Sequence, residues 1–272
     1  YGWGLLINRK PALGRQALLK QRLRGWNLLD PQSIANLYCS HEYLGQTSNL
    51  IHIHPAIKAN PRRYLDMFSN LVVHLTSLEH ASIKNTNQKL MEAVLSTPGY
   101  SKHQPQYSSP YKRNNASKSK SLKIVWITGD CRYHPVSRFL LGILSQSSLN
   151  SRHQHSLIST RPVDDSMGDL FKEINGLEFH DYSQYKAHYL TESIRELKSD
   201  IAIDLSGWTD GHSAASFLAR VAPVQVNYLG YFGTTGIPSM DWWLGDSNLF
   251  PSAMKQWHSE KIFRLPRCFI AW

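Results

Sequence analysis

The sequence predicts an α/β fold in which a mostly parallel sheet follows an all-α, repeat-like helical region. Three observations lead to this prediction. After residue 121, short runs of β-branched and aromatic residues alternate with stretches whose apolar residues recur at helical spacing. The strand-like runs are nearly all apolar, as expected when helices cover both faces of a parallel sheet. Before residue 101, in contrast, the apolar residues recur only at helical spacing.

The helical part starts with an apolar stripe over Pro11–Leu28, and Asp30-Pro31 then begins a second helix. The unit from Pro31 to Pro61 resembles a worn tetratricopeptide repeat, in which two antiparallel helices stack on their neighbours. The two prolines are 30 residues apart, whereas this repeat usually has about 34 residues. An unrelated helical hairpin domain is therefore an equal alternative. Further helical stretches are expected at residues 64–75 and 90–95.

A polar segment, residues 101–121, separates the helical part from the α/β part. It contains two prolines, many Ser and Asn residues and five basic residues. With almost no apolar residue, it has no face that a helix or strand could bury. The expected domains are thus a helical, tetratricopeptide-like domain at 1–100, a flexible basic linker at 101–121 and an α/β domain at 122–272.

The α/β part opens with a strand at Lys123–Thr128. The segment that starts at His134-Pro135 then carries apolar residues on one helical face, and proline suits the first turn of a helix. These apolar residues are Val136, Phe139, Leu140, Ile143 and Leu144. Further strands are expected at 155–159, 177–180, 201–205, 224–229, 242–244 and 262–265, and further helices at 188–198 and 214–220.

The composition excludes several classes of protein. Of the 272 residues, 42% are apolar and 18% are charged, which is typical of a packed globular protein and not of a disordered one. No apolar run approaches the roughly 18 residues of a membrane-spanning helix. Three cysteines are too sparse for a disulfide framework or a zinc knuckle, and His52 and His54 lack an acidic or cysteine partner nearby. We therefore expect a cytoplasmic protein without a bound metal.

The charge is distributed unevenly along the chain. Residues 1–120 carry 16 Lys and Arg and 5 Asp and Glu, a net charge of +11, whereas residues 121–272 carry 14 and 15, a net charge of −1. A nucleic-acid contact is one interpretation of such asymmetry. Because no aromatic-basic strand signature or zinc spacing accompanies the charge, a solvated basic face is favoured.

Three loops, residues 129–135, 204–209 and 230–236, follow predicted strands, and ligands of open parallel sheets bind beyond the carboxyl ends of strands. His134 lies at the positive end of a helix, which disfavours a charged imidazolium and leaves a neutral ring as base or hydrogen-bond partner. The alternative is a histidine bonded to the local backbone. Asp204 either orients a loop or a substrate hydroxyl or caps a turn. The glycines of the third loop permit close approach of a ligand to the main chain.

The sequence around these loops reads LKIVWITGDCRYHPVSRFLL, DIAIDLSGWTDGHSAASFLARVAPVQVNYLGYFGTTGIPSMDWWLGD and HSEKIFRLPRCF. Together these blocks resemble the amino-terminal catalytic lobe of the O-linked N-acetylglucosamine transferases over residues 121–272. In that family a tetratricopeptide superhelix precedes two Rossmann-like lobes. The resemblance therefore implies a Rossmann-like first lobe and supports the repeat upstream. It also implies that the chain is a fragment that ends before the second lobe.

The resemblance implies transfer of N-acetylglucosamine from UDP-GlcNAc to Ser or Thr hydroxyls of proteins, with inversion at the sugar carbon. It implies no metal or other cofactor, and a helical domain that presents the protein acceptors. His134 matches the family's histidine near the sugar and the acceptor, which acts as a base or a positioning group. By the same match, Leu229, Gly230 and Thr234 fall in the loop that lines the sugar pocket, and Asp204 and Thr209 in the second loop at the cleft.

Two positions depart from the family's pattern. Phe232 stands where the family usually has proline, and Trp208 stands where bacterial relatives commonly have histidine. A bulky ring at either place would narrow the sugar pocket or alter the choice of acceptor. The second hypothesis is therefore a catalytically inactive, protein-binding scaffold of the same family. Because the family's second lobe holds the nucleotide, residues 1–272 alone are expected to bind donor weakly and to turn over negligibly.

Overall fold

The computed structural model describes residues 121–150, 152–252 and 258–271, together with Ala12, Leu13, Gln16 and Lys20, which are helical. The chain divides into two units, Tyr1–Ser101 and Lys102–Trp272. Apart from those four positions and Ser121, the predicted helical domain, its repeat-like unit and the linker lie outside the described residues. The fold described below is that of the second unit.

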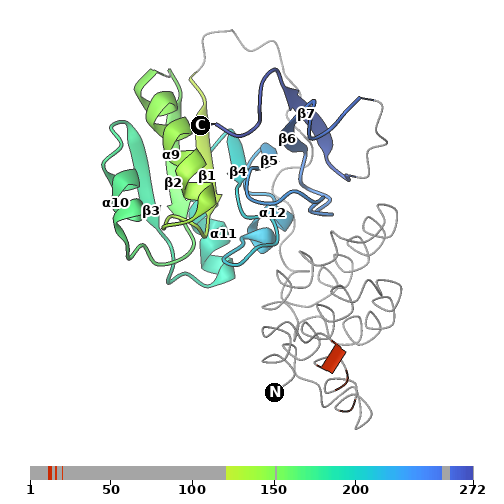
Figure 1. The fold of residues 1–272 in the computed structure, drawn as a ribbon. Helices are drawn as coiled ribbons and strands as arrows, with labels where there is room; N and C mark the ends of the chain where they lie inside the picture. The colour runs from red at the N-terminus through yellow and green to blue at the C-terminus, as the bar shows by residue number, and fades with distance from the viewer. Residues whose placement is uncertain are drawn as a thin grey trace. The chain divides into compact units, whose positions relative to one another are not determined.

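A seven-stranded sheet forms the centre of this unit, and all six pairings between neighbouring strands are parallel. The strand order is β3-β2-β1-β4-β5-β6-β7 (Figure 1). The strands are β1 (Lys123–Thr128), β2 (Gln154–Ser159), β3 (Leu177–Asp181), β4 (Ile201–Asp204), β5 (Val224–Tyr228), β6 (Trp242–Asp246) and β7 (Lys261–Leu265). The helices are α9 (Pro135–Asn150), α10 (Ser166–Lys172), α11 (Ala187–Glu196) and α12 (Ala214–Leu218).

The prediction of an α/β fold with a parallel sheet is confirmed, and each predicted strand is present with ends shifted by at most two residues. The prediction missed α10. This helix has only seven residues, of which Gly168 and Phe171 are buried, so it shows too little apolar periodicity to be recognised. Its local signal is the cap, since Asp165 accepts a hydrogen bond from the main-chain nitrogen of Gly168 at 3.0 Å.

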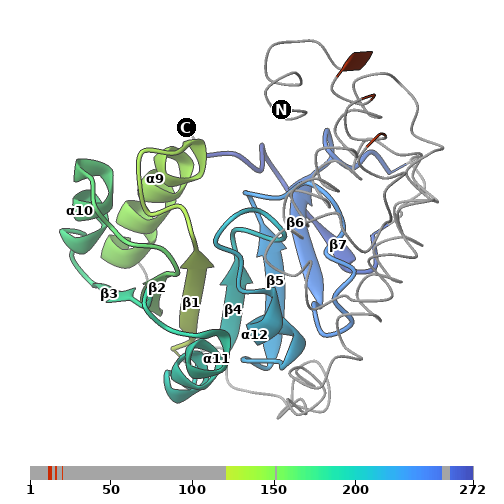
Figure 2. The same cartoon turned by 90° about the horizontal axis from the view of Figure 1, so that it is seen from below.

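The helices form two layers. The chain steps from β1 to β2 and β3 in one direction and then returns to place β4 beside β1. Because parallel crossovers are right-handed, this reversal puts α9 and α10 on one face and α11 and α12 on the other (Figure 2). In open sheets of this kind, ligands bind beyond the carboxyl ends of the strands where the order reverses. That point lies here between β1 and β4.

The core fixes the helix that carries the first candidate loop. Leu140 and Leu144 of α9 are completely buried and belong to one apolar cluster with Phe171 of α10 and Leu157 of β2. Burial of side chains of this size stabilises a fold by about 1.5–3 kcal/mol each. The amino-terminal end of α9 is thereby held at the carboxyl edge of the sheet. None of the helices that the structure describes has the length and apolar character needed to cross a bilayer.

Candidate active site

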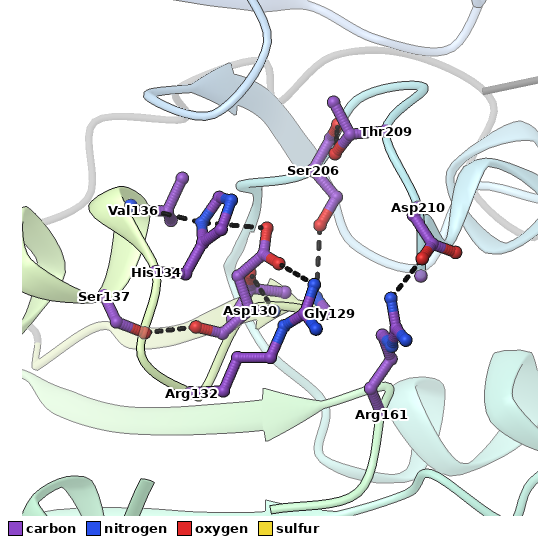
Figure 3. Close-up of polar contacts among 12 residues, drawn as sticks. Gly129, Asp130, Arg132, His134, Val136, Ser137, Arg161, Ser206, Thr209 and Asp210 are labelled. Atoms are coloured by element: carbon purple, nitrogen blue, oxygen red, sulfur yellow. Dashed lines mark hydrogen bonds and ion pairs between the residues drawn. The ribbon is translucent and has the colours of Figure 1, made fainter. Parts of the chain in front are cut away.

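Three loops that are far apart in the sequence meet at the carboxyl edge of the sheet. The main-chain nitrogen of Gly129, after β1, donates to Oγ of Ser206, after β4, at 3.1 Å (Figure 3). The indole nitrogen of Trp208 donates to the main-chain oxygen of Thr235, in the loop after β5, at 2.7 Å. The register brings these strand ends together, because Asp204 pairs with Ile127 on one side and with Asn227 on the other.

Two glycines allow the second and third loops to lie in close contact. A Cβ at Gly230 would lie 2.0 Å from the main-chain oxygen of Leu205. Gly207 has a φ of +54°, and a Cβ there would lie 2.4 Å from Cβ of Tyr231. Since no side chain fits at either position, both glycines are required by the contact between the second and third loops.

His134 directly precedes α9, and its side chain is 37% exposed. Its Nδ1 accepts a hydrogen bond from the main-chain nitrogen of Val136 at 3.3 Å and lies 3.5 Å from Oδ2 of Asp130 (Figure 3). Both contacts use Nδ1, so within the described part of the chain Nε2 remains for a ligand. The ring borders a pocket of about 590 Å³ whose lining residues are Tyr133, His134, Pro135, Arg138, Phe139 and Ala271.

Asp130 is a buried carboxylate in the first loop that the sequence pattern did not single out as a candidate site residue. It is 4% exposed, and its main-chain nitrogen donates to Oγ1 of Thr128 at 3.0 Å. Its two carboxylate oxygens have different neighbours, since Oδ1 is 3.4 Å from Nη2 of Arg132 and Oδ2 is 3.5 Å from Nδ1 of His134. The signal that points to it is a carboxylate immediately after a strand, four residues before a helix-start histidine. A residue so placed orients the imidazole.

The two contacts of Nδ1 correspond to two states of the ring. When Nδ1 accepts from Val136, a neutral imidazole carries its proton on Nε2 and is a donor toward the pocket. When Nδ1 carries the proton and faces the Asp130 carboxylate, Nε2 has a free lone pair and is an acceptor. Asp130 therefore favours the state in which His134 accepts a proton from a ligand.

Tyr133 and Arg138 form the exposed rim of the pocket. The guanidinium carbon of Arg138 lies 4.7 Å from the centre of the Tyr133 ring, and its Nη2 donates to the phenol oxygen. The main-chain nitrogen of Tyr133 donates to Asp165, and this bond contributes most to holding the pKa of that carboxyl below its ordinary value. The loop after β2 thus fixes the residue next to His134, and the rim carries a positive charge.

Asp204 is fully buried at the end of β4. Its Oδ1 accepts from the main-chain nitrogens of Ser206 and Gly207 at 3.0 and 3.1 Å, whereas its Oδ2 has no hydrogen-bond partner among the described residues. Burial raises the pKa of this carboxyl to about 7, and the nearby charge of Glu260 acts in the same direction. Asp204 therefore shapes the turn of the second loop and does not face the pocket beside His134.

The other predicted site residues lie in or next to the second and third loops, and most of their side chains point into the protein. The Thr209 hydroxyl donates to the main-chain oxygen of Ser206 at 2.7 Å. Leu229 is 3% exposed and adopts a φ of 72°, which is unusual for a branched residue. The Thr234 side chain is also buried, and its hydroxyl donates to Glu260 at 2.7 Å. The structure thus brings all the predicted residues to one edge of the sheet but turns several side chains inward.

Trp208 and Phe232, the two departures from the family's pattern, differ in their burial. Trp208 is 1% exposed, because its ring fills the junction between the second and third loops. Phe232 is 56% exposed, and its ring centre lies 5.9 Å from that of Phe269 in a T-shaped arrangement. Neither residue lines the pocket beside His134.

No group of three or more His, Cys, Asp and Glu side chains suited to a metal ion occurs in the part of the chain that the structure describes. His52 and His54 lie outside that part. Two polar atoms near the loop junction, Oδ2 of Asp204 and Oδ1 of Asn227, are buried without a hydrogen-bond partner among the described residues.

Comparison with known proteins gives consistent results. The family model described as glycosyl transferase family 41 matches residues 73–271. A tomato (Solanum lycopersicum) protein named probable UDP-N-acetylglucosamine–peptide N-acetylglucosaminyltransferase SPINDLY is 29% identical over 193 residues, which cover 70% of this chain and 20% of the relative. The Arabidopsis thaliana protein of the same name that is called SEC is 28% identical over 150 residues, covering 55% and 15%. This chain thus spans a fifth or less of the length of these relatives.

A solved structure shares the fold. A mutant O-GlcNAc transferase from Thermobaculum terrenum superimposes with a TM-score of 0.72 at 23% identity, over 96% of this chain and 48% of that chain. At this identity the likeness concerns the fold alone.

Proposed function

The chain belongs to glycosyl transferase family 41, and on this premise we propose that it contributes the first catalytic lobe of a protein O-GlcNAc transferase. The proposed reaction moves N-acetylglucosamine from UDP-GlcNAc to the hydroxyl of a Ser or Thr residue in a protein. The hydroxyl oxygen forms a bond to the sugar C1, the bond from C1 to the diphosphate oxygen breaks, and the configuration at C1 inverts. The hydroxyl loses its proton, and UDP departs with the bonding electron pair.

The observation that supports this proposal is the position of His134 in the first of the three loops that meet at the carboxyl edge of the sheet, beside a pocket at the start of α9. Its Nε2 is available beside a pocket of about 590 Å³, and its Nδ1 faces Asp130 at 3.5 Å. A group that accepts or holds the acceptor's proton in such a position contributes about 10²- to 10⁴-fold to a transfer rate. In this proposal His134 is the base or positioning group, and Asp130 orients its ring.

The charge of the rim suits the proposed donor. The departing diphosphate accumulates negative charge, which cationic groups and the amino-terminal end of a helix stabilise. Arg138, in the first turns of α9, brings an exposed guanidinium to the pocket that His134 borders. We propose that this end of α9 meets the donor.

The remaining predicted residues act through the shape of the loops. Leu229 and Gly230 set the main-chain path that lines the sugar, and Thr234 holds that path from behind. Asp204 and Thr209 fix the turn of the second loop. In this proposal the main chain of the loops, and not these side chains, meets the sugar.

Partners and conditions follow from the same proposal. The acceptors are proteins, which the amino-terminal helical region presents, and the reaction takes place in the cytoplasm without a metal ion or an organic cofactor. Because the resemblance assigns the nucleotide-binding groups to a second lobe, transfer is expected of the complete protein that the gene encodes.

The test is transfer of labelled N-acetylglucosamine from UDP-GlcNAc to cell-extract proteins by the complete protein. His134→Ala is compared with His188→Ala, which removes an exposed histidine of α11 that does not line the pocket. We expect transfer by the parent and the control and a loss of about 100-fold or more in His134→Ala. Absence of transfer by the parent refutes the function, and equal rates in the two variants remove the role of His134.

A further inference from the structure

Glu260 lies directly before β7, outside the three loops, and its carboxylate is nevertheless buried beneath the third loop. It is 4% exposed. Its Oε1 accepts from the main-chain nitrogen of Thr235 at 2.6 Å and from the Thr235 hydroxyl. Its Oε2 accepts from the hydroxyls of Thr234 at 2.7 Å and Ser259 at 3.2 Å. Four donors therefore meet one carboxylate.

This number of donors explains how a charge can be buried there. A carboxylate removed from water costs several kcal/mol unless hydrogen bonds replace its hydration. Two oxygens with about four acceptor sites are here matched by four donors. Glu260 is thus a fully satisfied charge, and the donors that satisfy it fix two consecutive residues of the third loop.

The hydroxyl of Thr234 is fully engaged in this arrangement. While it donates to Glu260, it accepts from the main-chain nitrogens of Ser259 at 3.0 Å and Gly236 at 3.3 Å. The same hydroxyl also lies 2.9 Å from the Ser259 hydroxyl. Because a hydroxyl has one proton and two lone pairs, these neighbours already fill its hydrogen-bonding capacity. Thr234 therefore has no hydroxyl contact left for a ligand.

The arrangement extends from Glu260 to the second loop. The main-chain oxygen of Thr235, whose nitrogen and hydroxyl are held by Glu260, accepts the indole N–H of Trp208 at 2.7 Å. The start of β7 is thus connected through one residue to the loop after β4. These contacts hold Thr234 and Thr235 of the third loop from its buried side.

We propose that Glu260 is a positioning residue for the transferred sugar: it acts through Thr234 and Thr235 and holds the main chain of the third loop in the conformation that receives the sugar. This inference rests on the proposed function, in which that loop lines the sugar site. Glu260 itself touches no substrate. It sets the selectivity of the protein for the sugar portion of the donor and contributes little to the affinity for the nucleotide.

The experiment measures the affinity of the complete protein for UDP-GlcNAc and for UDP, by calorimetry, and the KM and kcat of transfer. The variants are Glu260→Gln, Thr235→Val and Thr235→Ser. Gln keeps an acceptor for the Thr235 nitrogen but places an amide donor against a hydroxyl donor. Val removes one bond to Glu260 without changing the shape of the side chain, and Ser keeps that bond.

Two control variants separate an effect on the position of the third loop from a general loss of stability. Glu178→Gln removes a carboxylate of β3 whose side chain is 65% exposed. Phe171→Leu removes volume from the completely buried core beneath α10, so it lowers the melting temperature without touching the third loop. A variant that merely loosens the fold is expected to resemble Phe171→Leu.

We expect Glu260→Gln to bind UDP-GlcNAc roughly 10- to 100-fold more weakly, since displacement of a positioning element by about 1 Å has effects of this size. Its affinity for UDP is expected to change less than twofold. The affinity of Thr235→Val for UDP-GlcNAc should lie between that of Glu260→Gln and that of the parent. Thr235→Ser should have the parent's affinities. The two controls should leave both affinities and KM unchanged.

Three outcomes overturn the proposal. If Glu260→Gln binds UDP-GlcNAc as the parent does, Glu260 does not position the loop. If it loses affinity for UDP and UDP-GlcNAc equally, its role is structural only. In both cases the parent still transfers sugar, so the proposed function stands. If the parent binds UDP-GlcNAc no more tightly than UDP and does not transfer the sugar, the proposed function fails together with this inference.

Discussion

The indole nitrogen of Trp208 lies 2.7 Å from the main-chain oxygen of Thr235 and donates a hydrogen bond to it. This bond joins the loop after β4 to the loop after β5. The sequence predicts that a ring at this position narrows the sugar pocket or alters the choice of acceptor. In the structure this ring is 1% exposed and lies between the two loops. The bulk of tryptophan therefore contributes to the contact between the two loops.

The first prediction concerns this bond. Trp208→Phe keeps an aromatic ring but leaves the buried oxygen of Thr235 without its donor, which is expected to cost about 1–3 kcal/mol of stability. Urea unfolding of the parent and the variant measures this loss. The control is Trp242→Phe, at a half-buried ring on β6 that packs against Phe263. Equal losses in the two variants would contradict a specific role for the indole N–H.

The second prediction concerns the partner of the candidate catalytic ring. Asp130→Asn keeps the size of the side chain but removes the charge that favours a proton on Nδ1 of His134. We expect kcat for sugar transfer to fall by about tenfold or more, with little change in the affinity for UDP-GlcNAc. Steady-state kinetics and donor binding measure the two effects. An unchanged kcat would show that Asp130 does not orient His134 for proton transfer.

The third prediction is a pH dependence of stability that comes from Asp204. Its ordinary pKa of 3.8 is raised to about 7 in the folded protein, first by burial. Between these values the folded state binds a proton that the unfolded state has lost, so the stabilisation is complete below about pH 4. It decreases as the pH rises and is lost above about pH 7. The total change is on the order of a few kcal/mol.

Asp204→Asn tests this dependence because an amide cannot titrate. Its oxygen keeps the two bonds to Ser206 and Gly207, and its amide takes the place of the carboxylate oxygen that has no hydrogen-bond partner among the described residues. We expect the variant to be more stable than the parent at pH 8, and to lose this advantage at pH 5. Urea unfolding at both pH values measures the difference. A constant difference across this range would refute the raised pKa.

The fourth prediction concerns the approach of two main chains. In Gly230→Ala the new Cβ would lie 2.0 Å from the main-chain oxygen of Leu205, so one of the two loops must move. We expect a loss of stability of about 1–3 kcal/mol and a strong loss of sugar transfer. Gly142→Ala is the matched control, because Gly142 lies on the exposed side of α9 and a Cβ there meets nothing within 4 Å. Alanine in a helix should stabilise by about 0.5–1 kcal/mol.

The fold was predictable to the extent that it depends on local patterns. The strand at Lys123–Thr128 and the helix that starts at Pro135 follow from residue type and apolar spacing within a few residues. α10 was missed because seven residues with two buried positions leave no recognisable period. The edge at which the candidate residues gather was predictable as well, because all parallel strands end on the same side.

The sequence by itself thus determined the alternation of strands and helices, the three loops at one edge and His134 at a helix start. Only the tertiary structure decided which atoms face each other there. Glu260 meets Thr234 and Thr235, which lie about 25 residues earlier in the sequence, and no pattern within either segment specifies that contact. The reason is physical: backbone periodicity depends on neighbours along the chain, whereas the partners of buried polar groups depend on how distant segments pack.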